Sequence, residues 1–340
     1  MTTRDIIVAG ASMGGIETLK NLVVQLPEDL PAALFVVMHL AGNRSSILAH
    51  ILDQNTALTV KQAQDGEAIR HGYIYVAPPD RHLLLREQHM QLTCGPHENR
   101  VRPAIDPLFR SAAAVYRSRV IGIVLSGALD DGTAGLASIK LCGGVTAVQD
   151  PQDAICPDMP RSASAFVQVD YCVPVAKMGA ILNKLVREPA PEAPPVPKEI
   201  ALETELTTRP NFGSDKMDEL GRPAALACTT CGGPLWELCA EEPGRYRCRI
   251  GHAFAAQTLL ADQSEAMEHA LLAAIRTMGD QITVLGNLAE GSRRRGVSQS
   301  VRSYEKRIAE LNTHMQQLRR FLLDIEYNNL EPESSSAVQG

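Results

Sequence analysis

A short apolar run at the start of the chain ends in glycines that surround one serine, Ser12. Apolar residues then recur at helical spacing as far as Pro27, where a helix would stop. The run Gly10-Ala11-Ser12-Met13-Gly14 therefore predicts a buried strand, a sharp turn and a helix. In this setting a G-x-S-x-G pattern exposes the serine oxygen and leaves the next N–H free. The pattern favours an α/β fold in which Ser12 could attack a carbonyl group.

The same turn has two other interpretations. Gly10, Gly14 and Gly15 could cradle a phosphate at the helix N-terminus, as in a dinucleotide-binding oxidoreductase. Alternatively, Ser12 could serve only as a cap at the N-terminus of the helix. The complete G-x-G-x-x-G pattern is absent, however, and no Asp or Glu ends a second strand about 20 residues later. The serine-nucleophile hypothesis therefore depends on the residues that end the other predicted strands.

Two more predicted strands end in residues that can work with a serine. Residues 33–38 are apolar and lead to His39, and residues 120–125 are apolar and lead to Asp130 and Asp131. The carboxyl ends of parallel strands lie along one edge of a sheet, so we expect these side chains to meet. In a Ser-His-Asp relay the serine attacks, the histidine takes and returns its proton, and the aspartate orients the imidazole. The combination favours a serine hydrolase.

Short motifs follow one another through residues 1–188. They are Gly10-Ala11-Ser12-Met13-Gly14-Gly15, Val37-Met38-His39, Gly72-Tyr73-Ile74-Tyr75-Val76-Ala77-Pro78, Arg102-Pro103-Ala104-Ile105-Asp106-Pro107-Leu108-Phe109-Arg110-Ser111-Ala112, Leu125-Ser126-Gly127, Asp131-Gly132 and Met159-Pro160-Arg161-Ser162-Ala163. In this order and spacing they resemble the catalytic domain of the CheB family, bacterial protein-glutamate methylesterases that demethylate chemoreceptors. The resemblance implies an α/β fold with a doubly wound, mostly parallel sheet.

The resemblance also implies roles for individual residues. Ser12 matches the family's nucleophile, His39 the base and Asp131 the orienting acid, whereas Asp130 stands where the family often has Asn. The implied reaction is hydrolysis of γ-glutamyl methyl esters on a methylated chemoreceptor or a similar signalling protein, in chemotaxis or a related pathway. Some members also deamidate glutamine. No cofactor is expected for catalysis, and the backbone N–H groups of Met13 and Ala128 are expected to bind the oxyanion.

The sequence departs from the family pattern in three places. Ala128 replaces a methionine that lines the family's active site, and His39 is followed by residues 40–44 in place of a proline-rich loop. The first strand begins at about Asp5, which leaves no room for the family's phosphoacceptor receiver domain, so we expect a stand-alone form. A rival hypothesis is a catalytically weak scaffolding or regulatory member that acts through its C-terminal half.

Composition argues against several other classes of protein. The chain carries a formal net charge of −6 without a stripe rich in Lys or Arg, which argues against nucleic-acid binding. No apolar run reaches the roughly 18–20 residues of a membrane span, and no signal peptide precedes the first strand. We therefore expect a cytoplasmic protein without membrane insertion.

Residues 189–222 are rich in proline and then polar, which predicts a linker, laid over a neighbouring domain. A C-x2-C-x16-C-x3-H spacing follows within residues 223–256, and its residues are Cys228, Cys231, Cys248 and His252. This spacing is typical of a structural zinc site, in which metal binding supplies folding free energy to a piece too small to fold alone. Cys239 lies between the two pairs and is not expected to be a ligand.

Residues 257–330 predict two amphipathic helices joined by a turn at residues 291–296. Apolar residues of the second helix follow an unbroken 3-4 alternation from Val301 to Ile325, which is typical of a coiled-coil seam. A helical hairpin with such stripes buries little by itself, so we expect a homodimer through these helices. The acidic tail, residues 331–340, is expected to be disordered.

Overall fold

A computed structural model describes residues 2–39, 47–208, 213–238 and 244–330 of the chain. Residues 40–46, Cys239 and residues 331–340 therefore lie outside the described residues. The chain divides into two compact units, Met1–Leu260 and Ala261–Gly340.

The first unit is built around a sheet of seven parallel strands in the order β3-β4-β2-β1-β7-β8-β9. Its strands are β1 (Ile6–Ala11), β2 (Ala33–Met38), β3 (Thr59–Gln62), β4 (Tyr73–Val76), β7 (Val120–Val124), β8 (Val145–Gln149) and β9 (Tyr171–Val173). All six residues of β1 are buried, as its uninterrupted apolar run requires of a strand covered on both faces.

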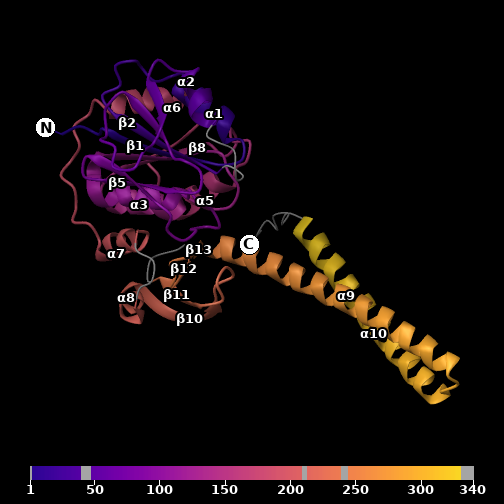
Figure 1. Ribbon diagram of the computed structural model, residues 1–340. Coiled ribbons are helices and arrows are strands. Elements are labelled where there is room, and N and C mark those ends of the chain that lie inside the picture. Colours follow the sequence, from indigo (N-terminus) through magenta and orange to yellow (C-terminus); the bar gives the residue numbers. More distant parts are fainter. Residues whose placement is uncertain (1, 40–46, 209–212, 239–243, 331–340) are drawn as a thin grey trace, which may run out of the picture. The chain divides into compact units, whose positions relative to one another are not determined.

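Helices cover both faces of this sheet. One hydrophobic core joins alternate residues of β1, Ile6 and Val8, to α3 (Ile105–Tyr116), α4 (Thr133–Leu141) and α5 (Asp158–Phe166). A second core joins Ile7, Ala9 and Ala11 to α1 (Gly15–Val23), α2 (Ile47–Asp53) and α6 (Val175–Leu185). Figure 1 shows these two layers on opposite sides of the sheet. The expected doubly wound α/β fold is confirmed.

The strand order reverses between β1 and β7. The chain places β2, β3 and β4 on one side of β1, whereas β7, β8 and β9 lie on the other side. Ligands of open α/β sheets bind outside the carboxyl ends of the strands at such a reversal. Ser12 follows β1 and His39 follows β2, so the two candidate residues stand at this position.

Between β4 and α3 the chain forms an antiparallel hairpin, β5 (His82–Arg86) and β6 (His89–Thr93). After α3 comes a short 3-10 helix, Arg117–Arg119, which leads into β7.

The segment predicted to be a linker is more structured than its composition suggested. Its proline-rich part lies along the first unit, where Arg117 donates to the carbonyl of Ala193 and Ser118 to that of Pro191. It then forms α7 (Lys198–Leu206) and α8 (Ser214–Leu220), which are not linker. The polar inner face of α7, with Glu203 and Thr204 buried, explains why its periodicity is hidden in the sequence.

A second, antiparallel sheet follows in the order β10-β11-β12-β13. Its strands are β10 (Gly221–Ala227), β11 (Pro234–Leu238), β12 (Arg245–Cys248) and β13 (Ala253–Ala255). Residues of α7 and α8 pack on Trp236 and Leu238 of β11 to form a small core. We refer to residues 221–258 as the second sheet region; it belongs to the same compact unit as the parallel sheet.

The second unit is a helical hairpin. Helix α9 spans Ala256–Arg294 and therefore begins in the first unit, and α10 spans Ser298–Leu330. The turn lies at residues 295–297 and not at 291–296, because α9 continues through Gly291 and ends before Gly296, whose φ is 75°. An ion pair between Arg293 and Glu305 (2.7 Å) joins the two helices. Within the described residues no helix is both long and apolar enough to cross a membrane.

Candidate active site and metal site

Ser12 stands in a tight turn between β1 and α1. Gly14, which precedes α1, has a φ of 77°, and a Cβ there would lie 2.7 Å from Cβ of Ile155. Ser126 holds the turn from the side of β7: its carbonyl accepts from the Ser12 N–H (2.9 Å), and its hydroxyl donates to the Met13 carbonyl (2.7 Å). The next residue, Gly127, comes so close that a Cβ would lie 2.9 Å from Cβ of Ser12. The serine is therefore fixed by backbone on two sides.

His39 joins Ser12 to Asp131. Its Nδ1 lies 3.2 Å from Oγ of Ser12, and its Nε2 lies 2.7 Å from Oδ2 of Asp131. An ionised Asp131 can only accept, so Nε2 carries the proton and Nδ1 is left with its lone pair towards the serine hydroxyl. The two ring nitrogens are exchanged relative to the serine-protease relay, in which Nε2 faces the serine and Nδ1 the aspartate, but one nitrogen can still take the serine proton while the other donates to the carboxylate.

The carboxylate of Asp131 is buried and accepts from five N–H groups. The donors are His39 Nε2, Asn99 Nδ2 and the backbone N–H groups of Ile105, Asp106 and Gly132. Burial by itself raises the pKa of Asp131, but the hydrogen bonds that it accepts from His39 and the other N–H donors outweigh it, so the pKa lies below its usual value. Asp131 is therefore ionised in the folded protein.

A second buried carboxylate, Asp106, lies beside Asp131. Its Oδ1 accepts from the N–H of Gly135 (2.6 Å) and its Oδ2 from Nδ2 of Asn99 (2.8 Å). Burial and the negative charge of Asp131 raise the pKa of Asp106 to about 7. The pair therefore holds a single full negative charge at mildly acidic pH, and that charge resides on Asp131.

Asp130 takes no part in the contacts of His39. Its Oδ1 accepts from the hydroxyl of Thr258 (2.7 Å), in the first turn of α9. Burial raises the pKa of Asp130, although the Thr258 hydroxyl lowers it. Of the two adjacent aspartates, Asp131 is thus the one brought to the imidazole.

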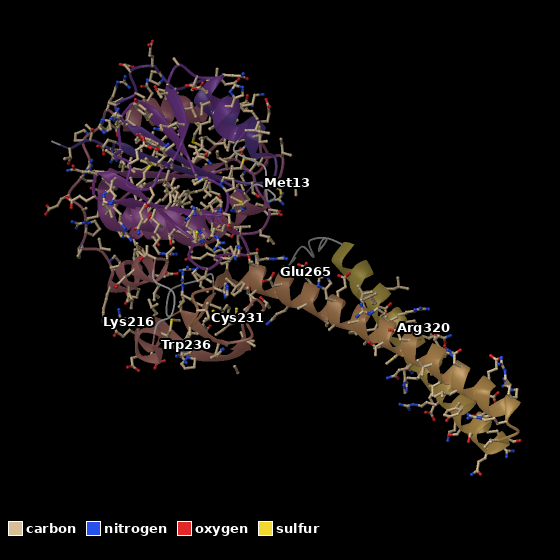
Figure 2. All side chains as sticks on the ribbon, viewed as in Figure 1. Met13, Lys216, Cys231, Trp236, Glu265 and Arg320 are labelled. Carbon is tan, nitrogen blue, oxygen red and sulfur yellow. The ribbon has the colours of Figure 1, made fainter. Side chains whose placement is uncertain are left out.

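The site opens into a cavity of about 550 Å³ lined by residues of the serine turn, α1 and the end of β2. Met13 and Ile155 on its rim are 63% and 68% exposed, and Met13 lies at the surface in Figure 2. In the described part of the chain the Met13 N–H has no hydrogen-bond partner, so it is available to an oxyanion. The second expected oxyanion donor is the N–H of Ala128, which follows Gly127, the residue that lies against Ser12.

Three polar residues of this site had no role in the sequence analysis: Asn99, Asp106 and Ser126. Asp106 and Ser126 both lie within quoted motifs, and this is a signal that could have identified them. Asn99 lies in no quoted motif and acts through a contact 32 residues away along the chain, which no local pattern announces.

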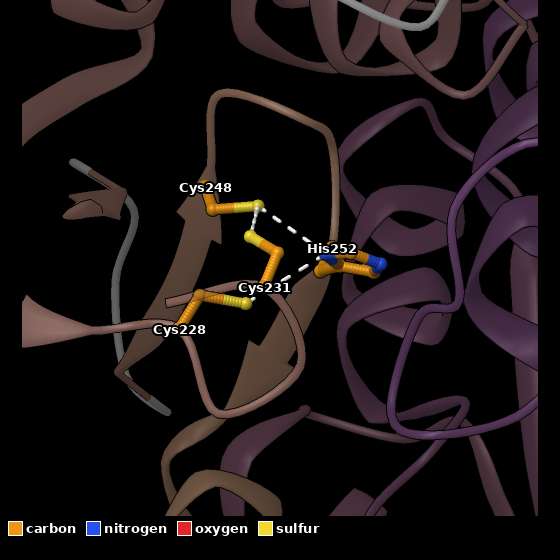
Figure 3. A group of neighbouring side chains, drawn as sticks. All are labelled: Cys228, Cys231, Cys248 and His252. Carbon is orange, nitrogen blue, oxygen red and sulfur yellow. Dashed lines mark hydrogen bonds between the residues drawn. The ribbon is translucent and has the colours of Figure 1, made fainter. Parts of the chain in front are cut away.

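The four predicted metal ligands come together at one end of the second sheet region (Figure 3). Their ligand atoms all lie within 4.8 Å of one another, and neighbouring pairs are 3.5–3.7 Å apart. A tetrahedron with metal–sulfur bonds of about 2.3 Å has edges of roughly 3.8 Å. Cys231 Sγ and Cys248 Sγ, at 3.7 Å, are too far apart for a disulfide. The residues therefore fit a tetrahedral zinc ion.

Comparisons with known proteins match the first half of the chain. Residues 7–182 match the family model described as CheB methylesterase. A putative protein-glutamate methylesterase/protein-glutamine glutaminase from Leptospira interrogans is 37% identical over 180 residues, which are 53% of this chain and 93% of that protein. A protein-glutamate methylesterase/protein-glutamine glutaminase from Thermotoga maritima is 36% identical over 185 residues, 53% of this chain and 54% of that protein.

A solved structure is similar over the same part. The crystal structure of the Thermotoga maritima CheB methylesterase catalytic domain matches with a TM-score of 0.53 and 35% identity, and the match covers 55% of this chain and 100% of that one. The family-model match ends at residue 182, before α7, α8 and the second sheet region.

Proposed function

Because the chain belongs to the CheB methylesterase family, we propose that it hydrolyses glutamate methyl esters on a chemoreceptor or a similar signalling protein, with Ser12, His39 and Asp131 as the catalytic residues. The observation that carries this proposal is the continuous chain of contacts from Ser12 Oγ through the His39 ring to Asp131. The names of the relatives also support deamidation of glutamine side chains at the same site.

In the proposed reaction the Ser12 hydroxyl attacks the ester carbonyl while its proton passes to Nδ1 of His39. The tetrahedral intermediate, with its oxyanion at the Met13 N–H, collapses as His39 returns the proton to the methoxy oxygen. Methanol leaves. Water then attacks the acyl-serine with the same proton transfers, which releases the glutamate carboxyl group and restores Ser12.

The shape of the cavity favours a protein substrate. The cavity is open, and the exposed apolar side chains of Met13, Ile16 and Ile155 border it. A glutamyl methyl ester stands on a flexible side chain, which could reach Ser12 while the surface around it packs against these residues. An exposed apolar rim next to a reactive group is typical of a site for a macromolecular partner.

The first test compares two neighbouring aspartates. Asp131→Asn should lower the rate of methanol release from a methylated receptor fragment by about 10⁴-fold, because the amide cannot hold and charge-stabilise the imidazole. Asp130→Asn should lower it by less than about tenfold, because the new amide oxygen can still accept from Thr258. Circular dichroism of both variants verifies that they are folded. A greater loss in the Asp130 variant would contradict the assignment of the acid.

We further propose that Cys228, Cys231, Cys248 and His252 bind one structural zinc ion. The fit of their spacing to a tetrahedron supports this, as do the short turns at each pair, where the Gly232 and Gly251 N–H groups donate to the carbonyls of Cys228 and Cys248. All four sites on a tetrahedral ion would be filled by protein, which leaves no position for a substrate. The role of the metal would thus be structural, and the esterase reaction would not pass through it.

We propose that the helical hairpin forms a homodimer. Val301 and Leu311 of the expected seam are buried within the hairpin itself, so this seam is partly covered in a single chain. Other apolar residues are exposed to solvent. On α9, Val284 and Leu288 are 56% and 44% exposed and lie one turn apart on one face. A second hairpin covering this face would remove them from water.

This proposal has a direct test. Val284→Glu with Leu288→Glu should convert the dimer into single chains of 36.8 kDa. The new carboxylates of each chain would lose their hydration if the interface formed. Multi-angle light scattering measures the mass. The matched control is Thr283→Glu with Asn287→Glu, which adds the same charges at exposed polar positions of α9 and should leave the dimer intact. A parent protein that already has the mass of one chain would contradict the proposal.

A further inference from the structure

Residues 97–99 lie between β6 and α3, and they pair with β13 of the second sheet region. The N–H of Asn99 donates to the carbonyl of Ala253 (2.8 Å), and the N–H of Ala253 donates to the carbonyl of His97 (3.3 Å). Glu98 and Ala253 form a parallel bridge. The second sheet is thus extended by backbone that belongs to the esterase part of the chain.

The side chain of Asn99 continues this connection into the candidate active site. Its Oδ1 accepts from the N–H of Ala255 (3.0 Å), and its Nδ2 donates to Asp131 Oδ1 (2.9 Å) and Asp106 Oδ2 (2.8 Å). Asn99 is buried, and both its amide oxygen and its amide nitrogen are hydrogen-bonded to protein groups. One side chain therefore links the last strand of the second sheet to the carboxylate that accepts from His39.

Asn99 also has an unusual backbone conformation, with a φ of 49°. Asparagine tolerates this left-handed region better than most residues. The position therefore suits an amide both by its conformation and by its contacts, since an aspartate there would add a third carboxylate next to Asp106 and Asp131.

The neighbouring residue, Glu98, connects the same segment to the metal ligands. Its carboxylate accepts from Arg110 on α3 (2.9 Å) and from Arg247 on β12 (2.7 Å), and all three side chains are buried. Arg247 directly precedes Cys248, and its Nη1 donates to the carbonyl of Gly251 in the turn between Cys248 and His252. The path from the ligand cluster to Asp131 therefore consists of direct contacts.

We propose that Asn99 is a positioning residue for the esterase reaction and that the second sheet region holds it in place, so that this region is a working part of the active site. The inference rests on the proposed function of Ser12, His39 and Asp131. Asn99 touches neither substrate nor His39: it fixes the orientation of the Asp131 carboxylate, while β13 fixes the orientation of the amide. Outer partners that orient metal-ligating side chains typically contribute 10-fold to 100-fold, and we expect an effect of the same size from Asn99.

The test replaces Asn99 in the full-length, metal-loaded protein. Asn99→Ala should lower kcat for methanol release by about 10-fold to 100-fold and change KM by less than about threefold, since the residue lies behind the acid. Asn99→Asp should lower kcat further, because its carboxylate repels those of Asp106 and Asp131. The control is Asn21→Ala on the exposed face of α1, which should change neither value.

A second measurement separates positioning from a merely structural role. The proton shared by His39 Nε2 and Asp131 should give a far-downfield ¹H NMR signal, which Ser12→Ala should keep and Asn99→Ala should weaken or shift. Zinc content should stay at one per chain in Asn99→Ala. Two results would overturn the inference when the parent protein is active. In one, Asn99→Ala has the same kcat as the parent. In the other, Asn99→Ala has a lower kcat but an unchanged NMR signal. If the parent protein releases no methanol, the proposed function fails, and the positioning role fails with it.

Discussion

Replacing Ser12 with alanine should lower ester hydrolysis by about 10⁴-fold or more and leave the fold intact. Ser12 supplies the oxygen that bonds to the substrate carbonyl carbon, so no acyl-enzyme can form without it. The side chain is partly exposed and its hydroxyl contacts His39, so its removal opens no cavity in the core. Methanol release gives the rate, and thermal unfolding verifies stability.

The control for this experiment is Ser164→Ala, which removes an exposed hydroxyl from α5. It should keep full activity. A fluorophosphonate probe should label the parent protein and the control at Ser12, and it should not label Ser12→Ala. A parent protein that resists the probe and shows no hydrolysis would instead favour the scaffolding alternative, in which the second sheet region and the hairpin carry the function.

Loss of the metal should have the largest effect on stability. Purified protein should carry one zinc per chain, and Cys231→Ser or a strong chelator should unfold the second sheet region, whose cores are small. A loss of roughly 5 kcal/mol would lower the melting temperature by about 10–20 °C in a unit of this size. Metal analysis and differential scanning calorimetry measure the two quantities.

Loss of the metal should also destabilise residues outside the four ligands, because charged side chains are buried next to them. Arg245 and Arg247 of β12 pair with Glu203 of α7, and Arg247 also pairs with Glu98. Breaking a buried pair by removing one partner costs about 3–5 kcal/mol. The esterase part should therefore be destabilised together with the second sheet region, and its activity should fall in parallel. Cys172→Ser, an exposed thiol outside the cluster, is the matched control and should change nothing.

The features that the sequence predicts well are local ones. An apolar run followed by a glycine-bounded serine predicts β1 and its turn, and strands that end in His39 and Asp131 need only the rule that parallel strands end at one edge. The cluster of three cysteines and one histidine follows from spacing alone, because each pair lies in its own short turn. Such patterns need no knowledge of how distant segments pack.

The contacts that the sequence analysis missed are between segments far apart in the chain. Glu203 and Arg247 look like ordinary surface charges in a sequence, since such residues are seldom buried unless they are paired. Their pairing depends on α7 and β12 meeting beside α3, which no local pattern announces. For the same reason the sequence predicts a linker and two separate domains, whereas residues 1–260 form one compact unit.

The contact between Asn99 and Ala255 also sets an order of events during synthesis. A ribosome completes Ser12, His39 and Asp131 well before it reaches β13, which begins about 120 residues after Asp131. At about 5–20 residues per second that interval lasts roughly 6–25 seconds. During it the nascent esterase lacks the strand that orients Asn99, and after it the strand must still leave the ribosome and gain its metal. A chain cut short between α6 and residue 255 would then keep its nucleophile, base and acid, but it should hydrolyse esters about 10-fold to 100-fold more slowly.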